Sequence, residues 1–420
     1  MEKNLNSEKI IFSLKKIATI FFILLLFSCQ PPVKKIEVVA DYNNFKFLEQ
    51  DITQLQNAYK DGSLTVKEVV QAYLDRIEEI DKNGPAINSV IQVNPDAIAI
   101  AEELDKELKE GKIRGPMHGI PVMLKDNIDT HDNMPTTGGS RALMNSHPLK
   151  DSFVAEKLRE VGAVIIGKTN LSEWANFRGQ LSSSGWSGVG GQTKNPYELN
   201  RNPCGSSSGS GAAVSANLTM LAIGTETDGS IVCPSHANGI VGIKPTVGLI
   251  SRSGVIPISF TQDTPGPMAR TVKDAAICLG VMVGVDSADS KTYESEGKFY
   301  NDYTQFLKQD GLKGKRIGFF KEPSGINFKV DEVMNQAIEY MKSEGAEIIE
   351  IEKIYEPEID GYSFEIMLFE YKDGLNKYFE SLGPNAPIKS LEELIACNIF
   401  RHFQKFLNLL NQLQQARRGK

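Results

Sequence analysis

Two neighbouring stretches say most about the fold of this 420-residue chain: PCGSSSGSGAAV at residues 203–214 and LAIGTETDGSI at residues 221–231. Their density of glycine and serine would also suit a flexible linker. Apolar runs interrupt them, however, at residues 212–214 and 221–224. Glycines between buried elements mark close backbone approach and turns with unusual dihedral angles. We therefore expect a tight turn that leads into a helix, followed by a buried strand that ends in a glycine turn.

On both sides of these stretches, predicted strands alternate with predicted helices. An apolar strand at 119–124 ends at Lys125, and a Thr-Val-Lys-Glu capping box at 65–68 opens an amphipathic helix. Further helices are expected at 95–109, 152–161 and 330–344, and further strands at 163–166, 240–243, 316–320 and 348–351. Alternation of this kind predicts an α/β fold with a mixed or parallel sheet covered by helices.

Composition and charge exclude one class of partner. The chain is 41% hydrophobic, and its formal net charge is −7 with neither sign strongly segregated. This length and composition are enough to bury a sizeable core. Nucleic-acid binding requires a basic face, and because none is visible we predict no nucleic-acid partner.

The first 29 residues have the pattern of an export signal. Two lysines, at positions 15 and 16, precede an apolar run at 17–27 that is short for a transmembrane span, and Ser28-Cys29 follows. A cysteine directly after a small residue at the cleavage position resembles a bacterial lipobox, so Cys29 is predicted to be lipidated. The alternative is a signal anchor with an incidental cysteine. We expect a signal peptide at 1–29, a polar tether at 30–44, and an exported, membrane-anchored bacterial lipoprotein at the periplasmic or outer-membrane face.

The remaining cysteines show no metal-ligand spacing. They are Cys204, Cys233, Cys278 and Cys397. A large exported domain does not depend on disulfides as a small one does. We therefore predict no metal and no required disulfide, and we interpret Cys204 and Cys233 as packing residues because neither has an evident basic partner.

The segment at 162–169, GAVIIGKT, matches the pattern of a phosphate-binding loop. Such a loop needs consecutive backbone N–H groups turned toward an anion. Ala-Val-Ile-Ile is instead a run of strand formers, whose N–H groups would be used in a sheet ladder. A nucleotide-hydrolysing function is therefore disfavoured.

The glycine- and serine-rich stretches suggest serine chemistry without histidine. The chain has five histidines, His118, His131, His147, His236 and His402. None lies in a G-x-S-x-G nucleophile elbow, so an ordinary Ser-His-Asp triad finds little support. Ser206 lies on the predicted turn before a helix, and Ser230 follows a strand and a glycine turn. The successive N–H groups of residues 227–230 could form an anion-binding nest.

Both serine segments resemble the paired halves of the amidase signature. The family pattern Pro-Gly-Gly-Ser-Ser-Gly-Gly-Ser aligns on 203–210, with Cys204 and Ser208 in place of glycines. The pattern Asp-Thr-Gly-Gly-Ser aligns on 226–230. The family's bridging and nucleophilic serines then fall on Ser206 and Ser230, 24 positions apart, which is the family's spacing. Its Gly-Ile-Pro strand ending in Lys-Asp lies on 119–126. Segments at 168–174, 239–245 and 262–270 are also similar to family segments.

This resemblance implies a fold and a mechanism. The fold is a central mixed, mostly parallel sheet covered by helices on both faces, with N-terminal helices, in a single domain at 45–420. The mechanism is a Ser-cisSer-Lys triad. Lys125, kept neutral by burial, takes the proton of Ser206, which takes that of Ser230. The backbone N–H groups of Thr227, Asp228, Gly229 and Ser230 hold the oxyanion. The Asp228 side chain either contacts substrate or orients the loop, Ser207 and Ser208 are expected to hydrogen-bond within their own loop, and no cofactor is required.

The departures from the family pattern indicate the substrate class. CGSSSGSG together with TETDGS is similar to bacterial peptide amidases, which remove the C-terminal amide of peptides. We therefore predict hydrolysis of a peptide amide or another small amide to acid and ammonia. The family also contains the tRNA-dependent amidotransferase subunit, but an exported lipoprotein has no charged tRNA to serve.

The C-terminal segment departs from the family. Members normally continue into a P-x-G-x-x-G-x-P-x-G segment and a late strand and helix, whereas residues 398–420 keep the spacing of an amphipathic helix. We expect this tail to be a replaced or out-of-frame ending, which makes the domain incomplete. The alternative function is then a catalytically impaired lipoprotein that only binds peptide. No feature of the sequence determines the oligomeric state.

Overall fold

The computed structural model describes residues 44–179, 181–354, 356 and 358–397. The predictions for the signal peptide with Cys29, for the tether up to residue 43 and for the tail at 398–420 fall outside these residues. The chain divides into two units, Met1–Phe45 and Lys46–Lys420, and the second is described below. Among the described residues, no helix combines the length and the apolarity needed to cross a membrane.

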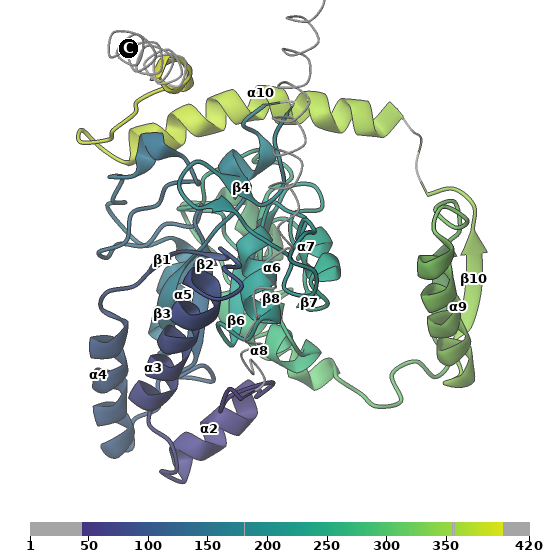
Figure 1. Cartoon of the computed structure of the whole chain (residues 1–420). Helices are drawn as coiled ribbons and strands as arrows, with labels where there is room; N and C mark the ends of the chain where they lie inside the picture. Colours follow the sequence, from purple (N-terminus) through teal and green to yellow (C-terminus); the bar gives the residue numbers. More distant parts are fainter. Residues whose placement is uncertain (1–43, 180, 355, 357, 398–420) are drawn as a thin grey trace, which may run out of the picture. The chain divides into compact units, whose positions relative to one another are not determined.

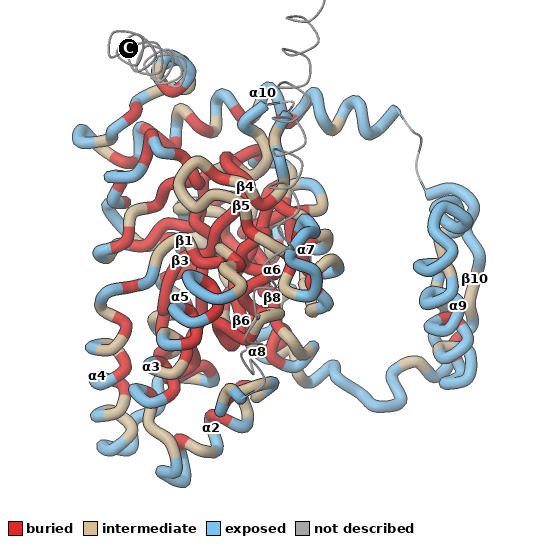
Figure 2. The backbone as a smooth tube through the Cα atoms, in the orientation of Figure 1, coloured by how far each residue is buried: buried red, intermediate tan, exposed pale blue. Residues whose placement is uncertain are grey.

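A six-stranded mixed sheet forms the centre of this unit (Figure 1). In spatial order its strands are β1 (Val90–Val93), β3 (Val164–Thr169), β2 (Pro121–Lys125), β6 (Leu221–Glu226), β8 (Thr264–Ala269) and β7 (Val241–Gly242). Strand β2 pairs in parallel with β3 and β6, whereas the outer pairings are antiparallel. Every residue of β2, β3, β6 and β8 is buried (Figure 2).

The predicted mixed sheet is confirmed, but its parallel part is smaller than expected. Strand β8 was not predicted, because Pro265 and Pro267 argue against an interior strand. The two prolines are two residues apart, so their missing N–H groups face the same side of the strand. That side faces β7, where the Pro267 carbonyl accepts from Ile243 N. Strand β7 is only two residues long and half-buried, so few ladder hydrogen bonds are lost.

Helices of the first 300 residues pack against this sheet largely as predicted. They are α2 (Ile52–Lys60), α3 (Val66–Arg76) with its π-helical extension η1 (Ile77–Lys82), α4 (Ala97–Lys109), α5 (Phe153–Glu160), α6 (Ser208–Ser215), α7 (Val232–Ala237) and α8 (Val272–Met282). The capping box before α3 is confirmed, because the Thr65 and Glu68 side chains each accept the other residue's backbone N–H. Helix α6 is buried from Ser208 to Val214. A Cβ atom at Gly209 would lie 2.2 Å from the Ser89 carbonyl oxygen, so this glycine permits the close approach expected of the segment.

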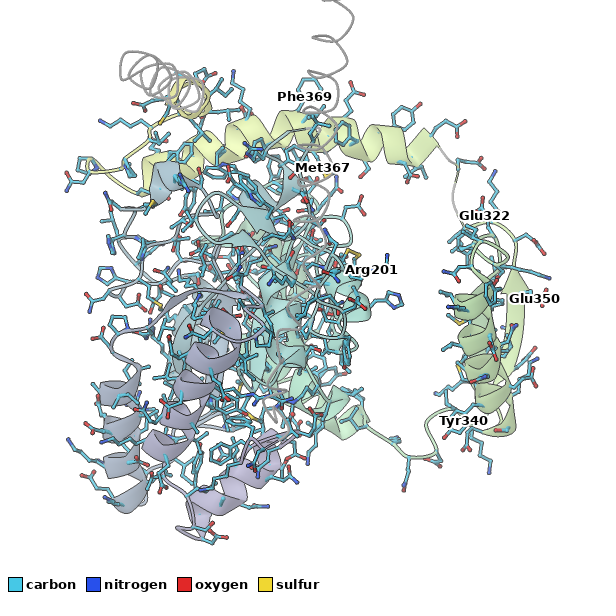
Figure 3. The ribbon with its side chains drawn as sticks, in the orientation of Figure 1. Arg201, Glu322, Tyr340, Glu350, Met367 and Phe369 are labelled. Atoms are coloured by element: carbon cyan, nitrogen blue, oxygen red, sulfur yellow. A yellow bond between two sulfur atoms is a disulfide. The ribbon has the colours of Figure 1, made fainter. Side chains whose placement is uncertain are left out.

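The remaining elements are small or peripheral to the sheet. Strands β4 (Trp186–Ser187) and β5 (Gly191–Gln192) form an antiparallel pair, and short 3-10 helices cover Arg141–Leu143, Glu173–Asn176, Ser290–Ser295 and Thr304–Phe306. Strands β9 (Arg316–Phe320) and β10 (Glu347–Ile351) pair in parallel and flank α9 (Phe328–Ser343), as predicted. Helix α10 (Glu358–Ser381) was not predicted. Its Met367 is buried, whereas Phe369 is 72% exposed (Figure 3).

The segment at 162–169 is strand β3, so the choice of a strand over a phosphate-binding loop is confirmed. The strand pairs with β1 on one side and with β2 on the other, which uses its backbone in the sheet. Lys168 is fully buried, and its Nζ donates to the Ile128 carbonyl at 2.8 Å and to Thr136 Oγ1 at 2.7 Å. No phosphate is needed to explain this lysine.

Cys204 and Cys233 form a disulfide, so their interpretation as packing residues is wrong. Their Cα atoms are 5.9 Å apart although the residues are 29 positions apart in sequence. Helices α6 and α7 contact each other, and this tertiary contact brings the residue before one helix next to the first turn of the other. Cys278 is a buried free thiol and Cys397 is a half-buried one.

Replacing both bridged cysteines by serine should lower the free energy of unfolding by about 2–4 kcal/mol, because the bridge closes a loop in the unfolded chain. Urea denaturation without reductant measures this difference. Cys397→Ser, which removes a free thiol, should change stability by less than about 1 kcal/mol. An alkylation count that finds every cysteine free in the unreduced, unfolded protein would contradict the bridge.

Candidate active site

Sheet topology brings the predicted lysine and the predicted serines together. Strands β2 and β6 are parallel neighbours, so their carboxyl ends lie at one edge of the sheet. Lys125 is the last residue of β2 and Thr225 is the penultimate residue of β6. Lys125 is fully buried. Its Nζ donates to Ser206 Oγ at 2.7 Å, to Thr225 Oγ1 at 2.8 Å and to the Thr225 carbonyl at 3.2 Å.

Burial of the lysine changes its protonation. Removal from water lowers the pKa of Lys125 to about 7, and the negative charges of Asp263 and Glu226 oppose this shift. A lysine amine with such a pKa is neutral in a large fraction of molecules near neutral pH. The expectation that burial depresses this pKa is met.

Backbone geometry and small residues place Ser206. The Gly205–Ser206 peptide bond is cis, and the Ser206 carbonyl accepts from Ser172 N at 3.1 Å. A Cβ atom at Gly205 would lie only 2.4 Å from Ser172 Oγ. Ser207 Oγ donates to the Thr225 carbonyl and accepts from Thr225 N.

The neighbouring serines hold the loop together. Ser208 Oγ donates to the Cys204 carbonyl at 2.6 Å, so Ser207 and Ser208 both hydrogen-bond within their surroundings, as predicted. Ser207 N donates to the Ser230 carbonyl at 3.2 Å, which joins the two serine segments through their backbones.

Glu226 shapes the loop that carries Ser230. Its Oε2 accepts from Ile231 N at 2.7 Å and from Val232 N at 2.9 Å, at the start of α7. Ser230 is 7% exposed, and its hydroxyl makes no hydrogen bond within the described part of the chain. The structure therefore shows the Lys125–Ser206 contact directly, whereas Ser206 and Ser230 meet through the backbone bond of Ser207.

The predicted oxyanion-binding groups are available. In the described residues, the backbone N–H groups of Thr227, Asp228, Gly229 and Ser230 have no acceptor. Gly229 has φ +77°, and a Cβ atom there would meet nothing within 4 Å. The Asp228 side chain is exposed and likewise makes no hydrogen bond among the described residues, whereas Glu226 and the Thr227 hydroxyl do hold the loop.

Several residues of the site were missed at the sequence level. A pocket of about 280 Å³ of empty space, partly open to solvent, includes Ser206 but not Ser230 in its lining. Its polar lining adds Asn127, Thr225, Thr227, Arg252 and Asp263, and Ala175, Val255, Ile256 and Ile258 contribute an apolar wall. Asn127 Nδ2 donates to Thr225 Oγ1 at 3.0 Å. A polar residue beside a strand end was the only available signal for these side chains.

Comparison with known proteins places the chain among relatives. The family model described as Amidase matches residues 68–419. A probable amidase of Arabidopsis thaliana is 43% identical over 365 residues, which are 85% of this chain and 69% of that protein. The native peptide amidase of Stenotrophomonas maltophilia has a TM-score of 0.83 and 48% identity, covering 86% of this chain and 73% of that one. An amidase family protein of Bacillus anthracis has a TM-score of 0.79 and 40% identity, covering 84% and 69%.

These likenesses extend over most of the chain but not over most of every relative. The chain spans between 50% and 69% of the length of three curated relatives. The matched segment includes both serine segments and Lys125. The chain belongs to the amidase signature family.

Proposed function

We propose that this protein hydrolyses a carboxamide, either the C-terminal amide of a peptide or a small amide, to acid and ammonia. The observation that carries the proposal is the 2.7 Å contact between the fully buried Lys125 amine and Ser206 Oγ. A desolvated lysine with a pKa of about 7 can act as a general base at neutral pH. The similar Stenotrophomonas protein is a peptide amidase, and a structure of a peptide amidase holds the competitive inhibitor chymostatin.

The proposed first half-reaction moves protons inward. Neutral Lys125 accepts the proton of Ser206, Ser206 accepts that of Ser230, and Ser230 Oγ attacks the amide carbon. The N–H groups of residues 227–230 donate to the resulting oxyanion, an interaction typically worth a few kcal/mol. The carbon–nitrogen bond then breaks, and the proton held by Lys125 returns through Ser206 to the departing nitrogen, which leaves as ammonia.

The second half-reaction repeats these steps with water. Water attacks the acyl-Ser230 ester while its proton passes along the same relay to Lys125. Collapse of the intermediate releases the acid and returns the proton to Ser230 Oγ. The catalytic residues of this proposal are Lys125, Ser206 and Ser230, and no metal or cofactor takes part.

We also propose that the enzyme is an exported lipoprotein anchored through Cys29. The support is the order of the basic pair, the apolar run and Ser28-Cys29 in the first 29 residues. In a bacterial host, Cys29→Ser should move the protein from the membrane fraction to the soluble or unprocessed fraction. Equal membrane retention of both proteins would instead indicate a signal anchor.

Ser230→Ala should reduce ammonia release from a C-terminally amidated peptide by about a thousandfold or more, because the nucleophile is lost. Lys125→Met should reduce it by about 10²–10⁴-fold, because the general base is lost. Ser324→Ala, at an exposed serine, is the matched control and should match the wild type. A folded wild-type chain that neither releases ammonia nor labels at Ser230 with a fluorophosphonate would favour the binding-only alternative. Labelling without ammonia release would indicate a different amide.

The pH dependence should report on Lys125. The amine accepts a proton only in its neutral form, so kcat/KM should rise with pH through a midpoint near 7. Initial rates between pH 5 and 9, in buffers of constant ionic strength, measure this midpoint. An activity that is constant from pH 5 to 9 would exclude Lys125 as the base.

A further inference from the structure

Asp263 carries a buried carboxylate that the relay does not use. It lies immediately before β8, whose first residue, Thr264, pairs with Glu226 at the end of β6. The Asp263 side chain is 6% exposed, and it lines the same pocket as Ser206 and Thr227. The carboxylate therefore lies at the edge of the sheet where the chemistry is proposed to occur.

The two oxygens of this carboxylate serve two different parts of the site. Oδ1 accepts from Thr227 Oγ1 at 2.5 Å. Oδ2 accepts from Ile258 N at 2.8 Å and from Ser259 N at 3.0 Å. Thr227 begins the loop that ends at Ser230, and Ile258 belongs to the apolar wall of the pocket. Asp263 thus joins the nucleophile loop to the pocket wall through charge-assisted hydrogen bonds.

The surrounding charges leave the carboxylate without an ion pair in the described part of the chain. Arg252 contacts Asp289 through Nε at 2.7 Å and through a terminal guanidinium nitrogen at 2.5 Å. Glu370 of α10 accepts from Ser259 Oγ, and Glu226 accepts from the start of α7. Burial raises the pKa of Asp263 to about 6, against the hydrogen bonds from Thr227, Ile258 and Ser259 and the Arg252 charge, so the group is mostly ionised above pH 7.

We propose that Asp263 is a positioning residue of the hydrolytic reaction, which holds Thr227 and the Ser230 loop in place and stabilises the ammonium form of Lys125. The proposal rests on the amide hydrolysis proposed above. Lys125 gains a positive charge each time it accepts a proton, and it is fully buried. A fixed negative charge nearby favours that form. Asp263 acts on Lys125 through the field and on Ser230 through Thr227, without touching the reacting atoms.

Asp263→Asn removes the charge and keeps the size of the side chain. The amide oxygen can still accept from Ile258 N and Ser259 N, and the amide nitrogen can donate to Thr227 Oγ1. We expect kcat for ammonia release at pH 8 to fall about ten- to hundredfold, with a smaller change in KM. The acid limb of kcat/KM should also move to lower pH, because Lys125 loses its proton more easily without the neighbouring charge. Asp310→Asn, at an exposed carboxylate, should change neither quantity.

A pair of variants at Thr227 separates positioning from charge. Thr227→Val keeps the shape of the side chain but removes the hydroxyl, so kcat should fall while the acid limb stays in place. Thr227→Ser restores a hydroxyl and should recover at least tenfold of the activity lost in Thr227→Val, within the range expected for a hydrogen bond to a charged group. A merely structural role for Asp263 would lower the melting temperature and kcat without moving the acid limb, and would overturn the proposal.

The rate of Ser230 labelling by a fluorophosphonate supplies a readout that needs no amide substrate. Slower labelling of Asp263→Asn than of the wild type, in the full-length protein with an unchanged cooperative unfolding transition, supports the inference. Equal labelling rates and equal acid limbs overturn the inference and leave the proposed hydrolysis intact. An unlabelled wild type overturns both.

Discussion

The hydrogen bonds of one buried amine organise this part of the molecule. Lys125 has no solvent contact, and an unpaired polar group in such a place would be costly. Its three acceptors come from two distant segments, the turn before α6 and the end of β6. Satisfying the amine therefore requires the parallel pairing of β2 with β6 and the close packing of α6 beneath the serine turn. The small residues of α6 and its turn are explained by this requirement.

The second buried lysine shows that burial alone does not make a base. Lys168 lies on the neighbouring strand β3, is also fully buried, and burial lowers its pKa as well. Its hydrogen bonds, however, go to a carbonyl and to Thr136, and Asp126 and Asp129 act against the shift. Lys125 differs because a serine hydroxyl is among its partners. The partner, rather than the desolvation, separates the two lysines.

Helix α10 closes the site from a distant part of the sequence. Its Tyr371, Leu375 and Phe379 pack in one cluster with Trp174, Ile256 and Ile258. Tyr378 donates to Asp129 at 2.9 Å, four residues after Lys125. The apolar wall of the pocket is thus held by residues more than 100 positions away. Contacts of such long range leave no periodic signal at either end, so neither the wall nor its support was predicted.

The sequence alone determined the helices and strands with strong periodicity, the α/β class, Lys125 and the two serine segments. These depend on local patterns, and the resemblance to a known family added the order of the segments. It did not reveal β8, because two prolines hide a strand whose neighbour on that side is very short. It also did not reveal the Cys204–Cys233 bridge or the role of Asp263. Those depend on which strand ends and loops become neighbours, and only the packing of the sheet with α6 and α7 decides that.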